Sequence, residues 1–310
     1  MNQLRNLTLV LLFTLLPLLP ATAASVDAHF HFLSPGDASN QRWATYSSIF
    51  RGKVFSDSTL ALKELKAAKV DKAVAISAGY FFIEEADAVK ENDFTAQEIA
   101  KHPESFVGLC GINAGQAWAL KEIERCKRLG FFGVKFHLTS AKVSLADKAQ
   151  YAAFSKLVAK ATELKMPVFL HVSYWVPQEV EAGISLSFEH PTGKFVYMHA
   201  FGPWYGHIFS LTASYLEDPK LVKNAYVDLS FTATYFNDAP ASRKEDLVWT
   251  LRKFGIDRVF MGSDFPVSDV RAAFTDVRKY PLTKAELRGV EGANFEAFLR
   301  ASGAKWGPQM

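Results

Sequence analysis

Cysteine is scarce in this sequence, since only Cys110 and Cys126 occur among its 310 residues. Their spacing excludes a cysteine-based zinc site. Cys110 falls in the apparent strand 106–112, and Cys126 lies on the apolar stripe of the helical pattern that follows. The sequence leaves two states open for this pair, a disulfide between a strand and a helix and two buried free thiols.

The sequence also lacks an excess of either charge. Its 35 Lys and Arg residues stand against 32 Asp and Glu, which gives a formal net charge of +3. Such a balance argues against nucleic acid or an anionic membrane as the partner. The composition, 49% hydrophobic and 22% charged, is that of a globular protein, and no linker or low-complexity segment divides the chain.

Long hydrophobic runs are missing except at the start. Leu7–Leu19 is apolar, follows the positive Arg5 and is closed by Pro20, before the small-x-small sequence Ala21-Thr22-Ala23. The run is shorter than the ~18–20 residues that a transmembrane helix needs. We predict that residues 1–23 are a signal peptide that is removed. The mature protein would be periplasmic or secreted without a stable membrane anchor; an uncleaved anchor is the alternative.

From Val26 onward, short apolar runs alternate with amphipathic helical patterns. Several of the runs are apolar throughout, as expected for parallel strands buried on both faces. Eight such units predict an α/β fold, a single distorted TIM (β/α)8 barrel over residues 24–310, with a doubly wound open sheet as the rival. The predicted strands are 26–32, 72–77, 106–112, 133–138, 168–173, 195–199, 225–230 and 258–263. The predicted helices are 59–69, 94–102, 118–129, 148–164, 178–188, 207–216, 243–254 and 284–301.

The first strand carries the feature around which the site is predicted. Strand alternation would place Asp27, His29 and His31 on one face, with Val26, Ala28, Phe30 and Phe32 on the other. The same alternation turns Lys135, His137 and Asp228 toward the barrel interior. Burying so many ionisable groups is costly unless they pair or bind a metal.

Three more polar groups stand at the ends of later strands. His171 and His199 end the fifth and sixth strands, and Asp264 follows the eighth. We predict one divalent metal, Zn²⁺ before Mn²⁺ or Fe²⁺, held by His29, His31, His171 and Asp264. Such an ion activates water, Asp264 would also shuttle its proton, and His199 would stabilise the oxyanion or orient the water.

Six stretches of the chain resemble the amidohydrolase superfamily, in the branch of aminocarboxymuconate-semialdehyde and hydroxybenzoate decarboxylases. They are 26–31, 101–109, 130–137, 224–230, 259–266 and 289–298, and Gly-Ser-Asp-Phe-Pro at 262–266 is the most specific. The resemblance implies a distorted TIM barrel and one catalytic divalent metal. Its ligands would fall on His29, His31, His171 and Asp264, and its acid/base histidine on His199.

Two departures from that branch favour hydrolysis over decarboxylation. The turn after His199 reads Ala-Phe-Gly-Pro-Trp-Tyr, and neither Arg42 nor Arg51 stands in a motif that matches the branch's carboxylate-binding arginine. Export also fits cytoplasmic catabolic decarboxylation poorly. We therefore predict a metal-dependent hydrolase of a small ester, lactone or amide. The alternatives are a non-oxidative decarboxylase of an aromatic or unsaturated acid, and an inactive exported binding protein.

Aromatic residues follow several strands and predict an apolar or ring-bearing small-molecule substrate, with sealing of the barrel top as the alternative. The predicted substrate contacts are Lys135, Arg51, Tyr174, Trp175 and Trp204. Lys135 would bind a substrate carboxylate or pair with Asp228; a carbamylated Lys135 that bridges two metals is less favoured. The sequence leaves the substrate, the native metal and the oligomeric state open, a homodimer included.

Overall fold

The computed structural model describes residues 24–35 and 55–308. The predicted signal peptide, 1–23, and the predicted substrate contact Arg51 lie outside the described residues. Within those ranges, no helix is both long and apolar enough to cross a membrane.

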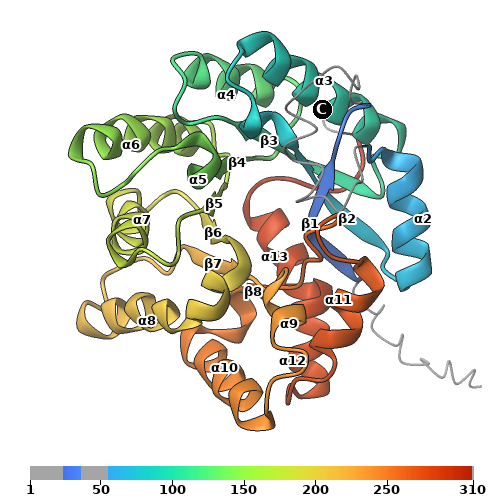
Figure 1. Cartoon of the computed structure of the whole chain (residues 1–310), viewed down its shortest axis with the longest axis vertical. Helices are drawn as coiled ribbons and strands as arrows, with labels where there is room; N and C mark the ends of the chain where they lie inside the picture. Colours follow the sequence, from blue (N-terminus) through green and yellow to red (C-terminus); the bar gives the residue numbers. More distant parts are fainter. Residues whose placement is uncertain (1–23, 36–54, 309–310) are drawn as a thin grey trace, which may run out of the picture.

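Eight parallel strands form one sheet in the order of the sequence, wrapped into a nearly closed barrel (Figure 1). Backbone hydrogen bonds join the first strand to the segment around the eighth: Ala28 N donates to Met261 O, and Asp264 N donates to His29 O. This joining favours the predicted barrel over the open sheet. The strands are β1 (Val26–Phe32), β2 (Lys72–Ser77), β3 (Phe106–Ile112), β4 (Gly133–His137), β5 (Val168–His171), β6 (Phe195–Tyr197), β7 (Ala225–Asp228) and β8 (Val259–Phe260).

Helices surround the barrel (Figure 1). Aspartates cap several of them, as when Asp57 accepts a hydrogen bond from Leu60 N and Asp147 accepts two from the following turn. The helices are α2 (Ser58–Ala68), α3 (Glu85–Lys101), α4 (Ala119–Arg128), α5 (Leu138–Ala141), α6 (Lys148–Glu163), α7 (Pro177–Glu189), α8 (Ile208–Glu217), α9 (Thr232–Tyr235), α10 (Ala241–Phe254), α11 (Val270–Val277), α12 (Lys284–Arg288) and α13 (Asn294–Ala301). Tighter or wider turns are η1 (Ala78–Phe81), η2 (Met198–His207), η3 (Ile256–Arg258) and η4 (Gly289–Ala293).

The predicted helix over 284–301 is interrupted. At Gly292, inside η4, the backbone leaves helical geometry, with φ of 179° and ψ of −47°. A side chain at this position would place its Cβ 1.9 Å from Ala24 O. The chain therefore breaks between α12 and α13 where the backbone of residue 24 passes against it, which periodicity alone does not reveal.

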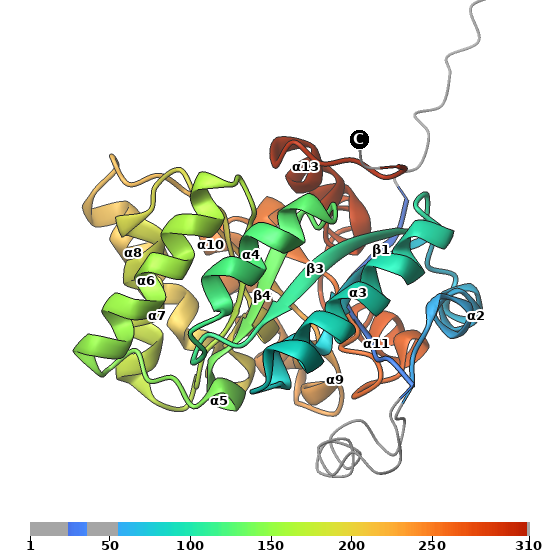
Figure 2. The same ribbon diagram turned by 90° about the horizontal axis from the view of Figure 1, so that it is seen from above.

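The apolar core has two parts. Val134 and Phe136 belong to the part between the strands and the outer helices, as strand alternation predicts. A second cluster fills the barrel interior with Val74, Phe169 and Phe260 and packs on Phe295 of α13. Figure 2 shows α13 at the end where the strands begin, with α5 and α9 at the opposite end. The apolar residues of this second cluster therefore fill the interior on the side where α13 packs.

The alternation predicted for β1 is wrong in one respect. Val26 and Ala28 pack in the interior cluster, whereas Phe30 and Phe32 pack against the outer helices. The cause is a register shift in the pairing with β2 between Asp27 and Phe30. The shift reverses the facing of the first half of the strand relative to the second.

Cys110 of β3 and Cys126 of α4 form a disulfide, with their Cα atoms 6.1 Å apart. Both side chains are fully buried. Of the two states that the sequence left open, the structure therefore contains the covalent link between strand and helix.

Candidate metal centre and active site

A cavity of about 210 Å³ opens at the carboxyl ends of the strands. In a TIM barrel this is the end where catalytic groups collect. Its walls combine imidazoles, one carboxylate, one ammonium group and aromatic rings. The lining residues are His29, His31, Tyr80, Phe81, Lys135, His137, His171, Tyr174, His199, Phe231, Asp264 and Val267.

Three donor atoms meet on one side of this cavity. His29 Nε2 lies 3.2 Å from His31 Nε2 and 3.2 Å from Asp264 Oδ1, and His31 Nε2 lies 3.2 Å from the same oxygen. Ligands that share one divalent ion at about 2.0–2.2 Å lie roughly 3–3.5 Å from one another. The spacing and the donor types therefore fit a divalent metal.

The protonation of these groups also suits metal binding. Burial lowers the pKa of His29 well below its usual value and lowers that of His31. Burial alone would raise the pKa of Asp264, but its electrostatic interaction with the His29 imidazole and the hydrogen bond with His31 bring it down to about 2. Neutral imidazoles and an ionised carboxylate are the forms that bind metal ions.

His171 lines the same cavity but stands apart from this trio. Its ring stacks on His137 with centroids 3.9 Å apart, and His137 stacks in turn on Tyr80 at 5.5 Å. The buried Nδ1 of His171 has no hydrogen-bond partner among the described residues. A buried imidazole nitrogen without a partner is costly, and a bound ion would remove that cost. The predicted ligand role of His171 stays a prediction.

His137 has a structural task of its own. Its Nδ1 accepts a hydrogen bond from Ser140 N, 3.1 Å away, and so caps the short helix α5. That nitrogen is occupied by the backbone, and the stacked ring holds His171 against the cavity wall. His137 therefore supports the wall of the cavity through its backbone cap and its stacked ring.

His199 begins an unusual stretch of backbone. His199, Ala200, Phe201 and Gly202 all have positive φ, and Gly202 combines φ of 58° with ψ of −132°. Positive φ is costly for residues that have a Cβ, and such strain clusters at functional sites. Asp264, with φ of 62°, shares this feature.

A hydrogen-bond group links His199 to His29. Ser230 Oγ lies 3.0 Å from His199 Nδ1 and 2.8 Å from His29 Nδ1, and it donates to Asp228 Oδ1. Strand alternation turns both Asp228 and Ser230 inward, but the sequence does not identify Ser230 as the link. The available signal was the two-residue spacing in Asp228-Leu229-Ser230, which places both polar side chains on one face of the strand.

Lys135 is the one ammonium group on the cavity wall among the described residues. Its side chain is buried, with 1% exposure, and burial lowers its pKa to about 8 while the charges of Asp228 and Asp264 oppose that shift. Its Nζ lies 6.0 Å from the centre of the Tyr80 ring. Lys135 therefore offers positive charge near neutral pH between aromatic walls.

Of the predicted substrate contacts that the structure describes, two line the cavity and two lie outside it. Lys135 and Tyr174 line the cavity. Trp175 and Trp204 are about half exposed and contact the ring of Tyr174 from outside, with centroids 5.2 and 5.8 Å away. They form an outer rim. Phe231 lines the cavity itself, although the predicted substrate contacts did not include it.

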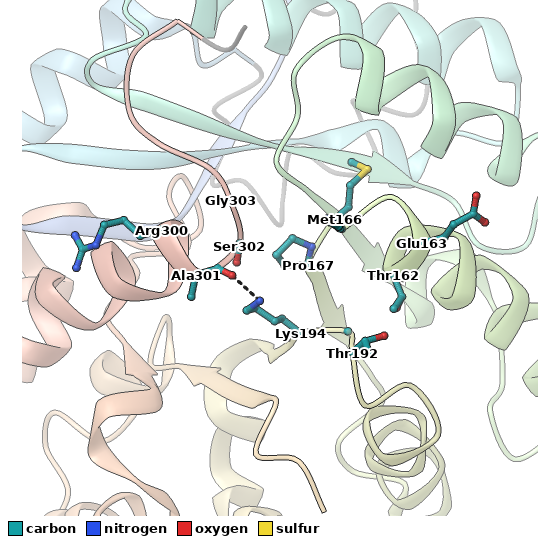
Figure 3. Close-up of a pocket in the computed structure, with 12 residues that line it drawn as sticks. Thr162, Glu163, Met166, Pro167, Thr192, Lys194, Arg300, Ala301, Ser302 and Gly303 are labelled. Carbon is teal, nitrogen blue, oxygen red and sulfur yellow. Dashed lines mark hydrogen bonds between the residues drawn. The ribbon is translucent and has the colours of Figure 1, made fainter.

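A larger hollow of about 510 Å³ lies at the other end of the barrel (Figure 3). Its walls include Pro167 and Lys194, which precede β5 and β6, and Arg300 to Gly303 near the C-terminus. Lys194 Nζ is engaged there, since it donates to Ala301 O at 2.8 Å. None of the metal-donor groups found among the described residues belongs to this hollow.

A family model described as "Amidohydrolase" matches residues 26–301. No curated protein matches the sequence. Among solved structures, a dihydroxybenzoic acid decarboxylase from Polaromonas sp. JS666 with bound manganese and 2-nitroresorcinol is 15% identical, with a TM-score of 0.67 over 90% of this chain and 97% of its own. A 5-carboxyvanillate decarboxylase from Sphingomonas paucimobilis is 16% identical, with a TM-score of 0.65 over 90% and 99%.

A 2,6-dihydroxybenzoate decarboxylase in complex with 2,6-dihydroxybenzoate is 15% identical to this chain. Its TM-score is 0.66 over 90% of this chain and 99% of its own. At such low identity, these likenesses establish the shared fold. The similarity spans 97 to 99% of the three solved chains and 90% of this one, so it extends over the whole barrel.

Proposed function

Since the chain belongs to the amidohydrolase family, we propose that its metal-dependent reaction is the non-oxidative decarboxylation of a small aromatic or unsaturated carboxylic acid. This proposal reverses the order of preference that the sequence suggested. The observation that carries it is the cavity itself: a buried ammonium group and a metal-donor trio face a space walled by aromatic rings.

The cavity limits the size and chemistry of the substrate. Its volume of about 210 Å³ is below the ~300–1,000 Å³ typical of pockets for drug-sized ligands. Tyr80, Phe81, Tyr174 and Phe231 offer ring surfaces. Lys135 offers a buried positive charge, and a bound carboxylate would pair with it through a charge-assisted hydrogen bond. A one-ring acid meets these conditions.

The likeness to solved decarboxylases supports the same choice. Two of these structures contain dihydroxybenzoate or nitroresorcinol, and one contains manganese. A metal held by His29, His31 and Asp264, with His171 as the proposed further ligand, would polarise the oxygen atoms of a bound acid. Zn²⁺ and Mn²⁺ are both compatible with this donor set, and we keep one divalent ion as the proposal.

The chain's own groups would then do the following. Lys135 binds the carboxylate, and the aromatic walls hold the ring and exclude water. Asp264, ionised at neutral pH, takes a proton from the substrate's hydroxyl or from water and returns it to the carbon that bears the carboxylate. The carbon–hydrogen bond forms, the bond to the carboxylate breaks, and CO₂ leaves with its electron pair kept by the ring. His199, whose ring stacks on that of His29 with centroids 5.0 Å apart, lines the same cavity and would orient the acid.

The deciding experiment is turnover in D₂O. The purified protein with Mn²⁺ is incubated with 2,6-dihydroxybenzoate and related one-ring acids, and CO₂ and the phenol are measured. Decarboxylation by protonation predicts one deuterium at the vacated ring carbon. Asp264→Asn should lose at least ~100-fold in turnover. Asp269→Asn, at the cap of α11, is the matched control and should retain it. Absence of CO₂ from every acid tested, with metal bound, would refute the proposal.

Hydrolysis of a small ester, lactone or amide stays as the second candidate. Asp264 is ionised at neutral pH, and a carboxylate beside a metal can also accept a proton from an attacking water. The two reactions differ in their products. Hydrolysis releases acid and no CO₂ and places no deuterium on carbon, so the same incubation with phenyl esters and aromatic lactones separates them.

We also propose that the protein is exported. The proposal rests on Arg5, the apolar run Leu7–Leu19 and the small residues before Ala24. The disulfide between Cys110 and Cys126 supports it, since such bonds persist in oxidising compartments. Mass spectrometry of the protein from a periplasmic extract should give a chain that begins at Ala24. A full-length chain in the cytoplasmic fraction would contradict the proposal.

A further inference from the structure

We propose that Ser230 is a positioning residue whose hydroxyl fixes one tautomer in two histidines at once, His29 and His199. The expected effect on metal binding and turnover rests on the proposed metal-dependent function. The hydrogen bonds that carry the inference do not depend on which reaction the site performs. They lie on the carboxyl side of β7, beneath the cavity.

The hydroxyl of Ser230 has three partners at hydrogen-bond distance. They are His29 Nδ1 at 2.8 Å, His199 Nδ1 at 3.0 Å, and Asp228 Oδ1. All four side chains are buried, with exposures of 0 to 6%. The two imidazole rings lie nearly parallel, with centroids 5.0 Å apart and planes at 26°. One oxygen thus stands between a predicted metal ligand and the predicted acid/base group.

The direction of each hydrogen bond follows from which groups carry a proton to donate. A serine hydroxyl has one proton to give and two lone pairs. Asp228 Oδ1 also accepts hydrogen bonds from the backbone N of Ser230 at 2.9 Å and of His199 at 3.3 Å, so this carboxylate oxygen acts as an acceptor. The hydroxyl proton therefore points to Asp228, and both lone pairs of Ser230 Oγ face the histidines.

Each histidine must then donate from Nδ1. A second contact supports this for His199, because its Nδ1 also lies 3.1 Å from the backbone oxygen of Ser230, which can only accept. For His29, the second neighbour of Nδ1 is the carboxylate of Asp228 at 3.5 Å, again an acceptor. Both rings are thereby held with hydrogen on Nδ1 and a lone pair on Nε2.

The consequence lies at the Nε2 atoms. His29 Nε2 is the atom 3.2 Å from both His31 Nε2 and Asp264 Oδ1, where a metal would be held. A lone pair there is required for ligation. On His199 the same tautomer leaves Nε2 ready to accept a proton. The loss of one hydroxyl should therefore weaken metal binding and turnover together.

The test is the tautomer of the metal-free protein, read by ¹⁵N NMR. Long-range ¹H–¹⁵N correlation distinguishes Nδ1–H from Nε2–H imidazoles, and His29→Gln and His199→Gln assign the two rings. The wild-type protein should show Nδ1–H at both. Ser230→Ala should convert at least one ring to a mixture of tautomers, and its Kd for Mn²⁺ should rise by about 10–100-fold.

Matched variants separate positioning from a general loss of packing. Ser187→Ala also removes a buried serine hydroxyl, one that donates to Ile184 O on α7, and it should change neither the tautomers nor the Kd. If Ser230→Ala does not fold, Ser230→Cys keeps the side-chain size with a weaker hydrogen bond, and an intermediate shift is expected.

Folded Ser230→Ala protein that keeps Nδ1–H on both rings and binds Mn²⁺ within twofold of wild type would overturn the inference. Failure of the proposed function looks different. In that case the tautomers and the Kd respond to Ser230→Ala while no acid is decarboxylated by the wild-type protein. The NMR and metal-binding results therefore judge the role of Ser230 without reference to the substrate.

Discussion

A buried carboxyl group on α3 should make the stability of this protein fall as the pH rises from about 4.5 to 7. Glu91 is 1% exposed, and it accepts hydrogen bonds from the backbone N and the hydroxyl of Ser34, just beyond β1. Burial raises the pKa of Glu91 from 4.5 to about 7, and the bonds from Ser34 offset part of the rise. Below pH 4.5 the folded state pays no charge-burial cost, because the carboxyl is protonated in both states.

The magnitude follows from proton linkage. Between pH 4.5 and 7 the folded protein holds a proton on Glu91 that the unfolded chain has released, so the free energy of unfolding decreases. A difference of about 2.5 pKa units is worth about 3 kcal/mol at 1.36 kcal/mol per unit. Glu91→Gln removes this dependence. Gln can still accept from Ser34 N and donate to Ser34 Oγ, so both hydrogen bonds can be kept.

The assay is urea denaturation of wild-type protein and Glu91→Gln at pH 4.5, 6 and 8. The difference in free energy of unfolding between the two should shift by about 3 kcal/mol in favour of Glu91→Gln between pH 4.5 and 8. Other titrating groups, such as Asp27, whose burial raises its pKa to about 7, cancel in the difference. Ser34→Ala removes a hydrogen bond that lowers the pKa of Glu91. In that variant the fall in the free energy of unfolding should therefore extend to higher pH. A difference that is constant across this range would refute the reasoning.

Three further outcomes are expected. Protein purified without chelator should hold about one equivalent of divalent metal by elemental analysis, lost in His171→Ala and Asp264→Asn; two equivalents would instead favour a carbamylated Lys135. Lys135→Met should raise KM for a carboxylate substrate about 10–100-fold, since a charge-assisted bond is worth about 1.5–3 kcal/mol; unchanged KM in steady-state kinetics would exclude its carboxylate role. Dithiothreitol should lower the free energy of unfolding by about 3 kcal/mol, because the disulfide closes a loop with a sequence separation of 16; a Cys110→Ala/Cys126→Ala protein should not respond.

The barrel was predictable because its strands have a local signature. Val168–His171 and Phe195–Tyr197 are short and largely apolar, and every strand end agrees with the prediction to within three residues. Burial on both faces demands such runs wherever the strand lies in the fold. Strand alternation and the family resemblance predict one centre from His29, His31, His171 and Asp264. The structure brings the donor atoms of His29, His31 and Asp264 within 3.2 Å of one another, and the ligand role of His171 stays a prediction.

Local signals failed where distant backbone intervened. The break at Gly292 exists because Ala24 passes against it, and the reversal within β1 exists because its pairing with β2 shifts register. Neither event leaves a mark on hydrophobic periodicity. The preference for hydrolysis over decarboxylation rested on the turn after His199, the lack of a matching arginine motif and the predicted export. No contact among the described residues contradicts it, and the shape of the cavity only changes the order of the two candidates.

The sequence by itself determined the repeating strand and helix pattern and the residue types available for chemistry, because both depend on local periodicity and composition. Only the tertiary structure decided that Cys110 meets Cys126, that Trp175 lies at an outer rim, and that Ser230 reaches two histidines. Each of these facts is a distance between residues on different elements. Such distances are set by the hydrogen bonds that join β1 to the segment around β8 and by the register of each strand pair. Closure and register depend in turn on packing across the whole chain.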